Sequence, residues 1–301
     1  MATSALEVDG SHFEFVKKRA YNTICVYKGD GEFLRIGPER LLKKDLDLHK
    51  RLLGFGFPVP KILKVGKIGR RFYYIEESFG DLHFGGMFGT EWKGQGVVSN
   101  ASFSSFLKVV GEFGGAQISH PFVSKSEKDF YTGIHLDYLI EELPNLKTDV
   151  LRAFEKVKKD VSPFPLVLTH GDFNPYNLTP RGVIDIESMF HGPAGFDLIA
   201  NVYTTYFFPK DGDYESLRRY EFTEAQMQKY MEMVDELYKG PGYPKLSQHQ
   251  DGFALCRAVW AAVRMQKMPK LQEWRYRLLE KITADYLKGK SIANTIRTFK
   301  S

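Results

Sequence analysis

The sequence predicts an α+β protein of two domains, with an antiparallel sheet first and a larger helical part after it. Three observations support this. The first ninety residues have the pattern of strands around one helix, and apolar and polar side chains alternate along these strands with a two-residue period. Beyond residue 100 the apolar residues recur at helical spacing. The chain has 301 residues, a length that favours about two domains.

The first domain is expected to hold five strands and one helix. The strands are expected at 12–19, 21–28, 32–37, 59–64 and 71–76. Gly29-Asp30-Gly31 predicts a tight hairpin between the second and third strands. Pro38 suits the first turn of a helix, and Gly54 ends the leucine-rich helical pattern that follows it. The prediction is a five-stranded antiparallel sheet with one helix after strand three.

The second domain is expected to begin after a glycine-rich stretch. Residues 79–100 hold six glycines and little pattern, which indicates a loop or linker. We therefore expect domains at 1–78 and 79–301. Short strands and turns are expected over 166–187. The expected helices are 102–118, 128–142, 146–159, 197–207, 215–239, 251–268 and 271–288.

Composition excludes several classes of protein. Apolar residues make up 43% and charged residues 26%, values typical of a globular protein rather than a disordered one. No apolar run is long enough for a membrane helix, and the N-terminus lacks the pattern of a secretory signal. Cys25 and Cys256 lie far apart, as in a reduced cytoplasmic protein with buried thiols. No interleaved basic and aromatic residues indicate a nucleic-acid partner.

The positive charge lies towards the end of the chain. The net charge is +5, and residues 191–301 carry 17 Lys and Arg against 13 Asp and Glu. The excess indicates either a solvated basic face, which we prefer, or an anion-binding surface.

One stretch carries the residues of a reaction. An apolar strand ends in His170-Gly171-Asp172, and Asn177 follows on the same loop. A tight turn then leads back to Asp185. Phosphoryl transfer needs a carboxylate that orients and deprotonates the attacking hydroxyl, and an amide oxygen and a carboxylate that hold Mg²⁺. Each residue alone is typical of a turn or cap, but the set at this spacing favours phosphoryl transfer.

The pattern resembles the aminoglycoside phosphotransferase branch of the protein-kinase-like superfamily, which includes choline-kinase-like enzymes. The resemblance covers nearly the whole chain and implies a two-lobed protein-kinase-like fold. It implies that Asp172 is the catalytic base and that Asn177 and Asp185 are Mg²⁺ ligands.

The same resemblance assigns supporting roles. His170 is expected to hold the loop by hydrogen bonds, and Asp197 to brace it, which is compatible with a place at a helix N-terminus. Glu187, two residues after Asp185, is expected to assist the metal through water.

The first lobe of such a fold needs a cation on strand three and a carboxylate on the next helix. Arg35 stands where the family usually has Lys, and its fork binds phosphate bidentately. Asp45 falls within the apolar arc of the helix, where an acid is costly unless paired. We therefore predict that Arg35 pairs with Asp45. The alternatives are that Asp45 reaches solvent or that the helix is rotated.

The nucleotide contacts are expected from the backbone. The chain lacks a Gly-x-Gly-x-x-Gly loop, as this branch tends to, and the amides near Ala20, Tyr21 and Asn22 are expected to cradle phosphate. The segment that holds Glu77 and Phe79 resembles the hinge between lobes, where the backbone binds adenine.

The predicted function is transfer of the γ-phosphoryl group of ATP or GTP, with Mg²⁺, to a hydroxyl of a small molecule. A neutral or anionic acceptor suits the charge of the second domain at least as well as a polycationic aminoglycoside. The alternative is a catalytically inactive kinase-like module that binds nucleotide or acts as a scaffold. Replacement of the family's Lys and Glu by Arg35 and Asp45 supports this alternative, whereas Asp172, Asn177 and Asp185 oppose it.

Overall fold

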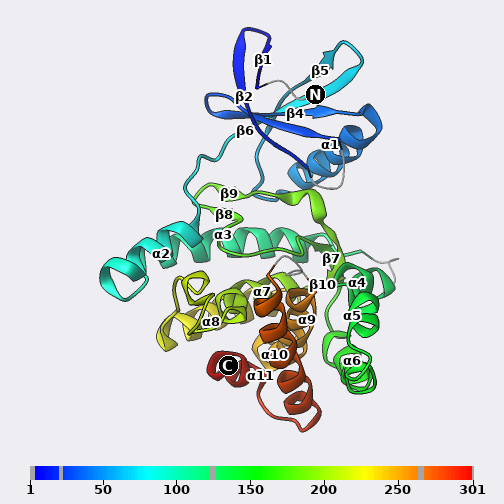
Figure 1. Cartoon of the computed structure of the whole chain (residues 1–301), viewed down its shortest axis with the longest axis vertical. Helices are drawn as coiled ribbons and strands as arrows, with labels where there is room; N and C mark the ends of the chain where they lie inside the picture. The colour runs from blue at the N-terminus through cyan, green and yellow to red at the C-terminus, as the bar shows by residue number, and fades with distance from the viewer. Residues whose placement is uncertain (1–3, 20–22, 123–126, 264–267, 300–301) are drawn as a thin grey trace. The chain divides into compact units, whose positions relative to one another are not determined.

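The chain divides into two compact units. The computed structural model describes residues 4–19, 23–122, 127–263 and 268–299 (Figure 1). Unit 1 comprises Met1–Leu82 and Thr179–Glu187, and unit 2 comprises His83–Leu178 and Ser188–Ser301. The domains were predicted as 1–78 and 79–301, so the structure adds a later segment of the chain to the first unit.

Unit 1 contains an antiparallel sheet of six strands. Their order is β1-β2-β3-β4-β6-β5. The strands are β1 (Ala5–Val8), β2 (Ser11–Lys18), β3 (Cys25–Lys28), β4 (Glu32–Gly37), β5 (Ile62–Ile68) and β6 (Arg71–Glu77). Only β1 was not predicted. Asp9 and Gly10 form its turn to β2 with positive φ angles of 53° and 86°, as a two-residue hairpin turn of this kind requires.

The helix α1 (Glu39–Gly54) packs on the sheet of unit 1. Its Leu42 and Leu46 are buried in a cluster with Ile24, Phe72 and Tyr74. A second apolar cluster of the sheet contains Val8, Phe13, Tyr27, Leu34, Ile36 and Ile75. Successive side chains of a strand point to opposite faces of the sheet, so the strands contribute residues to two separate clusters.

The segment Thr179–Glu187 belongs to unit 1 through contacts with the loop before β5 and the end of β6. It begins within the short strand β8 (Leu178–Thr179) and contains β8's partner strand β9 (Gly182–Val183). The Val183 N–H donates to the Pro58 carbonyl oxygen at 2.7 Å. A Cβ on Gly182 would lie 2.1 Å from the same oxygen, so this approach needs a glycine. A 3₁₀ turn, η1 (Ile186–Ser188), replaces the end of the strand predicted up to residue 186.

Unit 2 is mainly helical, with one two-stranded sheet of β7 (Leu166–Thr169) and β10 (Phe190–Pro193). The helices are α2 (Phe84–Gln95), α3 (Asn100–Ser119), α4 (Glu127–Gly133), α5 (Leu136–Glu142), α6 (Lys147–Val161), α7 (Phe196–Tyr203), α8 (Glu224–Lys239), α9 (Gln250–Ala262), α10 (Pro269–Leu287) and α11 (Ile292–Thr298). The 3₁₀ turns are η2 (Thr204–Phe207), η3 (Glu215–Leu217) and η4 (Leu246–Gln248). None of the described helices meets the length and apolarity that a membrane span needs.

Several predicted helix limits were wrong. The helix expected over 128–142 is broken near His135, whose φ is +62°. The helix expected from 215 begins at Glu224, because Thr223 and Gln226 form a capping box there. The α2 helix occupies the stretch that was predicted as a loop, and α11 and β10 were not predicted.

Candidate active site

The loop after β7 carries the predicted base. Gly171 has a φ of +81°, which favours glycine, and a Cβ there would lie 2.5 Å from the Phe190 ring. The chain turns sharply at this point and leaves the Asp172 side chain 34% exposed. Asp172 is thus held on a rigid turn and remains accessible.

Asp197, in the first turn of α7, holds this loop in place by hydrogen bonds. Its Oδ2 accepts hydrogen bonds from the His170 N–H and the Gln117 amide, each at 2.7 Å, and its Oδ1 accepts from the Gly171 N–H at 3.0 Å. Burial raises the pKa of Asp197, although these donors and the nearby His170 favour its charged form. The carboxylate therefore fixes the backbone of the two residues that precede Asp172.

Asp172 and Asn177 lie together on the loop. The Asn174 amide donates to Asp172 Oδ1 at 2.9 Å, and the Asn177 amide donates to the backbone carbonyl of Asp172 at 2.9 Å. The second bond uses the nitrogen of the Asn177 amide and leaves its carbonyl oxygen for another ligand. The predicted base and one predicted metal ligand are neighbours in unit 2.

Arg257 on α9 contacts the loop of Asp172 and was not predicted. It donates to the Gly171 carbonyl oxygen at 3.0 Å, lies 3.5 Å from Asp172 Oδ1 and stacks over the Trp260 ring at 3.8 Å. The sequence did contain a signal for Arg257, since it is a basic residue within an apolar helix and a buried cation needs partners. Gln117, a polar residue within the apolar helix α3, gave the same kind of signal.

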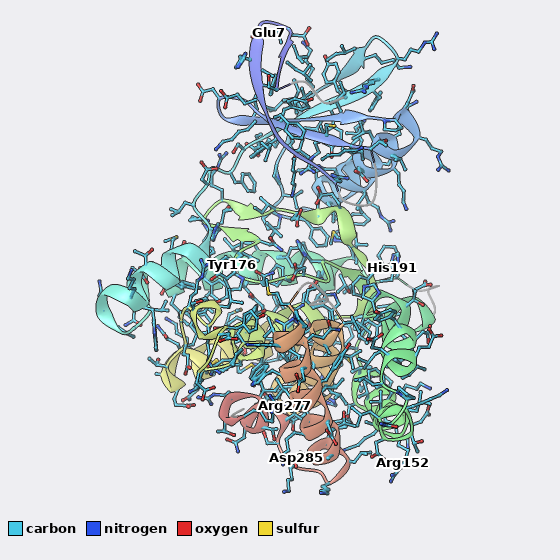
Figure 2. The ribbon with its side chains drawn as sticks, viewed as in Figure 1. Glu7, Arg152, Tyr176, His191, Arg277 and Asp285 are labelled. Atoms are coloured by element: carbon cyan, nitrogen blue, oxygen red, sulfur yellow. The ribbon has the colours of Figure 1, made fainter. Side chains whose placement is uncertain are left out.

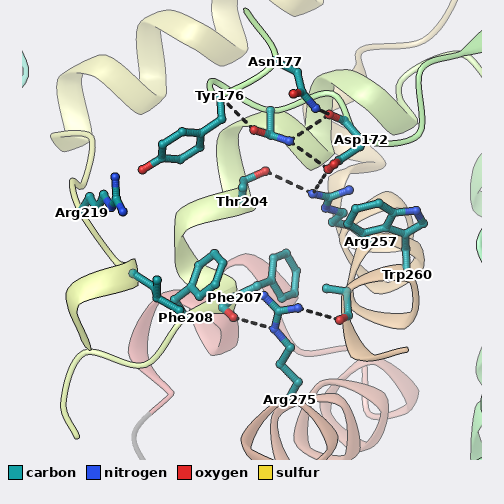
Figure 3. Close-up of a pocket in the computed structure, with 13 residues that line it drawn as sticks. Asp172, Tyr176, Asn177, Thr204, Phe207, Phe208, Arg219, Arg257, Trp260 and Arg275 are labelled. Atoms are coloured by element: carbon teal, nitrogen blue, oxygen red, sulfur yellow. Dashed lines mark hydrogen bonds and ion pairs between the residues drawn. The ribbon is translucent and has the colours of Figure 1, made fainter. Parts of the chain in front are cut away.

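Asp172 forms part of a pocket in unit 2 with a volume of about 450 Å³. Figure 3 shows Asp172, Tyr176 and Asn177 near one end and Arg275 near the other. Tyr176 also appears in the view of all described side chains (Figure 2). The lining residues are Asp172, Asn174, Tyr176, Asn177, Thr204, Phe207, Phe208, Leu217, Arg219, Arg257, Trp260, Ala261 and Arg275.

In unit 1, Arg35 pairs with two carboxylates that were not predicted. Glu76 lies 2.7 Å away, and Glu187 forms a second ion pair. Burial opposes the Arg35 cation, but the charges of Glu76 and Glu187 outweigh it and hold the pKa of Arg35 well above its ordinary value. Tyr74 faces Arg35 across β4 and β6, so Glu76 is the diagonal neighbour on the same face.

The predicted pair of Arg35 and Asp45 is therefore wrong. Asp45 instead pairs with Arg19, at the end of β2, at 2.5 Å. Arg19 also lies 2.5 Å from Glu187. An acid in the apolar face of α1 does need a cation, as expected, but the sheet offers two arginines: Arg19 directly after β2, and Arg35 on β4. Strand register, which the sequence pattern does not specify, decides between them.

The prediction that Glu187 assists a metal through water stays a prediction; in the structure its carboxylate binds two guanidinium groups. Arg35 and Arg19 overcome the effect of burial and hold the pKa of Glu187 well below its usual range. Two residues earlier, Asp185 is exposed and has a φ of +61°. A left-handed backbone at an aspartate is uncommon and is often found where function requires it.

The donors at Asn177 and Asp185 suit magnesium. Amide and carboxylate oxygens are the ligands that Mg²⁺ prefers, and Mg²⁺ is usually held by one or two carboxylates together with phosphates and water. Among the described residues no group of three or more His, Cys, Asp or Glu side chains forms a metal site of protein ligands alone. Asn177 belongs to unit 2 and Asp185 to unit 1.

The remaining nucleotide-binding predictions concern unit 1. Ala20, Tyr21 and Asn22 lie outside the described residues. The Glu77 N–H donates to the Lys61 carbonyl oxygen at 2.9 Å, so this N–H is used within the protein. Phe79 lies under the Arg181 guanidinium at 4.9 Å.

Known structures share this fold. A choline/ethanolamine kinase family protein from Mesorhizobium loti is similar with a TM-score of 0.58 at 13% identity, over 95% of this chain and 92% of that chain. A thermostable mutant of aminoglycoside phosphotransferase APH(4)-Ia, in a ternary complex with AMP-PNP and hygromycin B, gives 0.55 at 15% identity, over 90% and 93%. The streptomycin–ATP–APH(2″)-IIa complex gives 0.50 at 12%, over 95% and 93%.

At the level of sequence, no protein-family model and no curated protein matches the chain. The structural likeness confirms the predicted kinase-like fold. A fold alone does not define a reaction, because the residues of the site determine the chemistry.

Proposed function

We propose that the protein transfers the γ-phosphoryl group of ATP, with Mg²⁺, to a hydroxyl of a small molecule. The observation that carries the proposal is the loop of unit 2, where Asp172 and Asn177 are fixed side by side at the wall of a pocket. Two structures with this fold contain AMP-PNP or ATP beside an aminoglycoside, which supports the same reaction class.

In this proposal Asp172 accepts the proton of the acceptor hydroxyl while the oxygen attacks the γ-phosphorus. Its exposure gives the hydroxyl access, and Asn174 and Arg257 fix the orientation of its carboxylate. Asn177 and Asp185 would hold Mg²⁺, which would supply positive charge to the phosphate oxygens. Arg35 stabilises nucleotide phosphate from β4, and the backbone near Glu77 and Phe79 receives the adenine.

The experiment compares the purified protein with Asp172→Asn. We expect ADP release from Mg²⁺·ATP, slow without acceptor and faster with one, and abolished by EDTA. Asp172→Asn should lower acceptor-dependent turnover by about 10²- to 10⁴-fold, the usual contribution of a general base. Nucleotide affinity should change little, whereas Asp185→Ala should weaken Mg²⁺-dependent nucleotide binding.

The matched control is Asp213→Asn, because Asp213 is an exposed aspartate that pairs with Lys270 on the surface. It should leave turnover unchanged. A wild-type protein that binds Mg²⁺·ATP but releases no ADP would instead support the inactive nucleotide-binding module. Equal turnover of Asp172→Asn and wild type would remove Asp172 from the reaction.

A further inference from the structure

The pocket beside Asp172 carries an excess of positive charge. Arginines from three parts of unit 2 line it: Arg219, Arg257 and Arg275. Asp172 supplies the only carboxylate among the described lining residues. A polycationic acceptor would meet repulsion here, whereas an anion would be attracted.

Arg275, on α10, is a buried cation held by backbone oxygens. It donates to the Phe207 carbonyl at 2.9 Å and to the Ala261 carbonyl at 2.8 Å. No described carboxylate forms an ion pair with it. Burial, and next the positive charge of Arg257, lower the pKa of Arg275 to about 9. Carbonyl dipoles orient this guanidinium but do not neutralise it, so the site favours an incoming anion.

Arg219 supplies a second guanidinium, at the exposed side of the pocket. It lies against the ring of Tyr176, 5.8 Å from the centre, and no ion pair joins it to a described carboxylate. A guanidinium presents a planar fork that binds carboxylate or phosphate through two parallel hydrogen bonds. Arg219 and Arg275 are therefore the two arginines best suited to bind a ligand, because Arg257 already supports the loop of Asp172.

The positions of the lining residues determine how a ligand would be oriented in the pocket. Figure 3 shows Asp172 and Asn177 at one end, Arg275 at the other, and Arg219 at the side. The rings of Phe207, Phe208 and Trp260 line the space. A ligand whose hydroxyl faces Asp172 would thus place its other groups among aromatic rings and arginines.

We propose that the phosphoryl acceptor is a hydroxylated organic anion whose carboxylate or phosphate group is bound by Arg219 and Arg275. This inference rests on the proposed function. In the reaction the acceptor oxygen forms a bond to the γ-phosphorus, the bond from that phosphorus to the β,γ-bridging oxygen breaks, ADP leaves, and the hydroxyl proton passes to Asp172.

The first experiment measures ADP release with acceptors that share a carbon skeleton and differ in charge. One set is gluconate, glucose and glucosamine, and the other is glycerol 3-phosphate and glycerol. Hygromycin B represents polycations. We expect the anion of a set to give at least a tenfold higher kcat/KM than its neutral or cationic counterpart. Gluconate and glycerol 3-phosphate distinguish a carboxylate from a phosphate ester. A neutral or cationic member that is preferred would overturn the proposal.

The second experiment titrates inorganic phosphate into the nucleotide-free protein by calorimetry. Wild type should bind phosphate, and Arg219→Gln should weaken that binding about tenfold, the value of one charge-assisted hydrogen bond. Arg275→Gln should weaken it at least as much if that variant folds. Arg277→Gln is the matched control, because Arg277 is exposed on the same helix and does not line the pocket (Figure 2). It should bind phosphate like wild type.

The two experiments separate this inference from the proposed function. If no ADP is released from Mg²⁺·ATP under any condition, the proposed function fails. The phosphate titration still measures whether Arg219 and Arg275 bind an anion. ADP release together with no phosphate binding, or with equal phosphate binding by wild type and Arg219→Gln, would show that the proposal of an anionic acceptor is wrong. The proposed phosphotransferase function would then still stand.

Discussion

At the scale of single residues, Asp197 is the clearest case of a side chain that acts through another. Three hydrogen bonds from Gln117, His170 and Gly171 converge on its buried carboxylate. Asp197→Ala leaves these buried donors without an acceptor, so we expect the free energy of unfolding to fall by about 3 kcal/mol. Turnover should fall too, because the loop loses its orientation. Urea unfolding with parallel assays measures both changes.

The comparison for that variant is Asp213→Ala, which removes an exposed carboxylate from the surface pair with Lys270. Its stability should change by less than about 0.5 kcal/mol. An Asp197→Ala protein as stable and as active as this control would mean that the loop does not depend on Asp197.

The two thiols give a second prediction at this scale. Cys25 and Cys256 are free and buried. Burial raises the pKa of the Cys256 thiol well above its ordinary value, so its reactive thiolate form is suppressed at pH 8 to 9. We expect no rapid reaction of the native protein with Ellman's reagent in this range, and reaction of both thiols in urea. Rapid labelling of one native thiol would contradict the buried positions.

The sequence predicted which residues share one loop better than which distant residues contact each other. His170, Asp172 and Asn177 were predicted to lie on one loop because they are close together in the chain, and the structure places them between β7 and β8. The partner of Arg35 was not found, since Glu76 and Glu187 reach it through strand register and a distant chain segment. Contacts between residues far apart in the chain depend on packing, which a periodic pattern does not encode.

At the scale of elements, α2 shows where local propensity fails. Its glycines predicted a loop, because glycine disfavours a helix by about 1 kcal/mol relative to alanine. The helix forms because Phe84 and Phe88 are fully buried against Phe106, and Phe88 also against Phe222. The close approach of Tyr176 explains the glycine at position 85, because a Cβ there would lie 2.7 Å from the Tyr176 ring. Tertiary packing therefore outweighs propensity.

The charged contacts between β4 and η1 give the prediction for elements. Arg35 and Glu187 are both largely buried, with side chains 13% and 16% exposed. Glu187→Gln leaves two arginines short of one negative charge, so we expect a loss of about 3 kcal/mol in unfolding free energy. In a double-mutant cycle with Arg35→Met, the two losses should fall short of additivity by about 1 kcal/mol or more. Urea unfolding of the four proteins measures this coupling.

The control cycle pairs Arg35→Met with Glu39→Gln. Glu39 contacts Lys43 and Lys67 on the surface and shares no partner with Arg35, so these losses should add. Additive losses in the cycle with Glu187 as well would mean that the observed ion pair contributes nothing to stability.

At the scale of the whole molecule, the return of Thr179–Glu187 to unit 1 could not be predicted from pattern. The predicted boundary follows a change in composition near residue 79, and such a change marks a position along the chain only. The later segment joins unit 1 through Val183 and Arg181, which bond to the Pro58 and Ser78 carbonyls. Three passages of the chain therefore link the units, so no single cut separates them.

This chain path predicts how fragments behave. A fragment of residues 1–82 lacks Val183, which is fully buried, and Glu187, which holds two arginines. We expect it to unfold without a sharp transition in urea, followed by far-UV circular dichroism. The same fragment joined by a glycine-serine linker to residues 178–188 should unfold cooperatively. Val183→Asn in the joined protein should remove about 2 kcal/mol, the value of burying one valine side chain. Equal unfolding curves for the short and joined fragments would show that residues 1–82 fold without the returning segment.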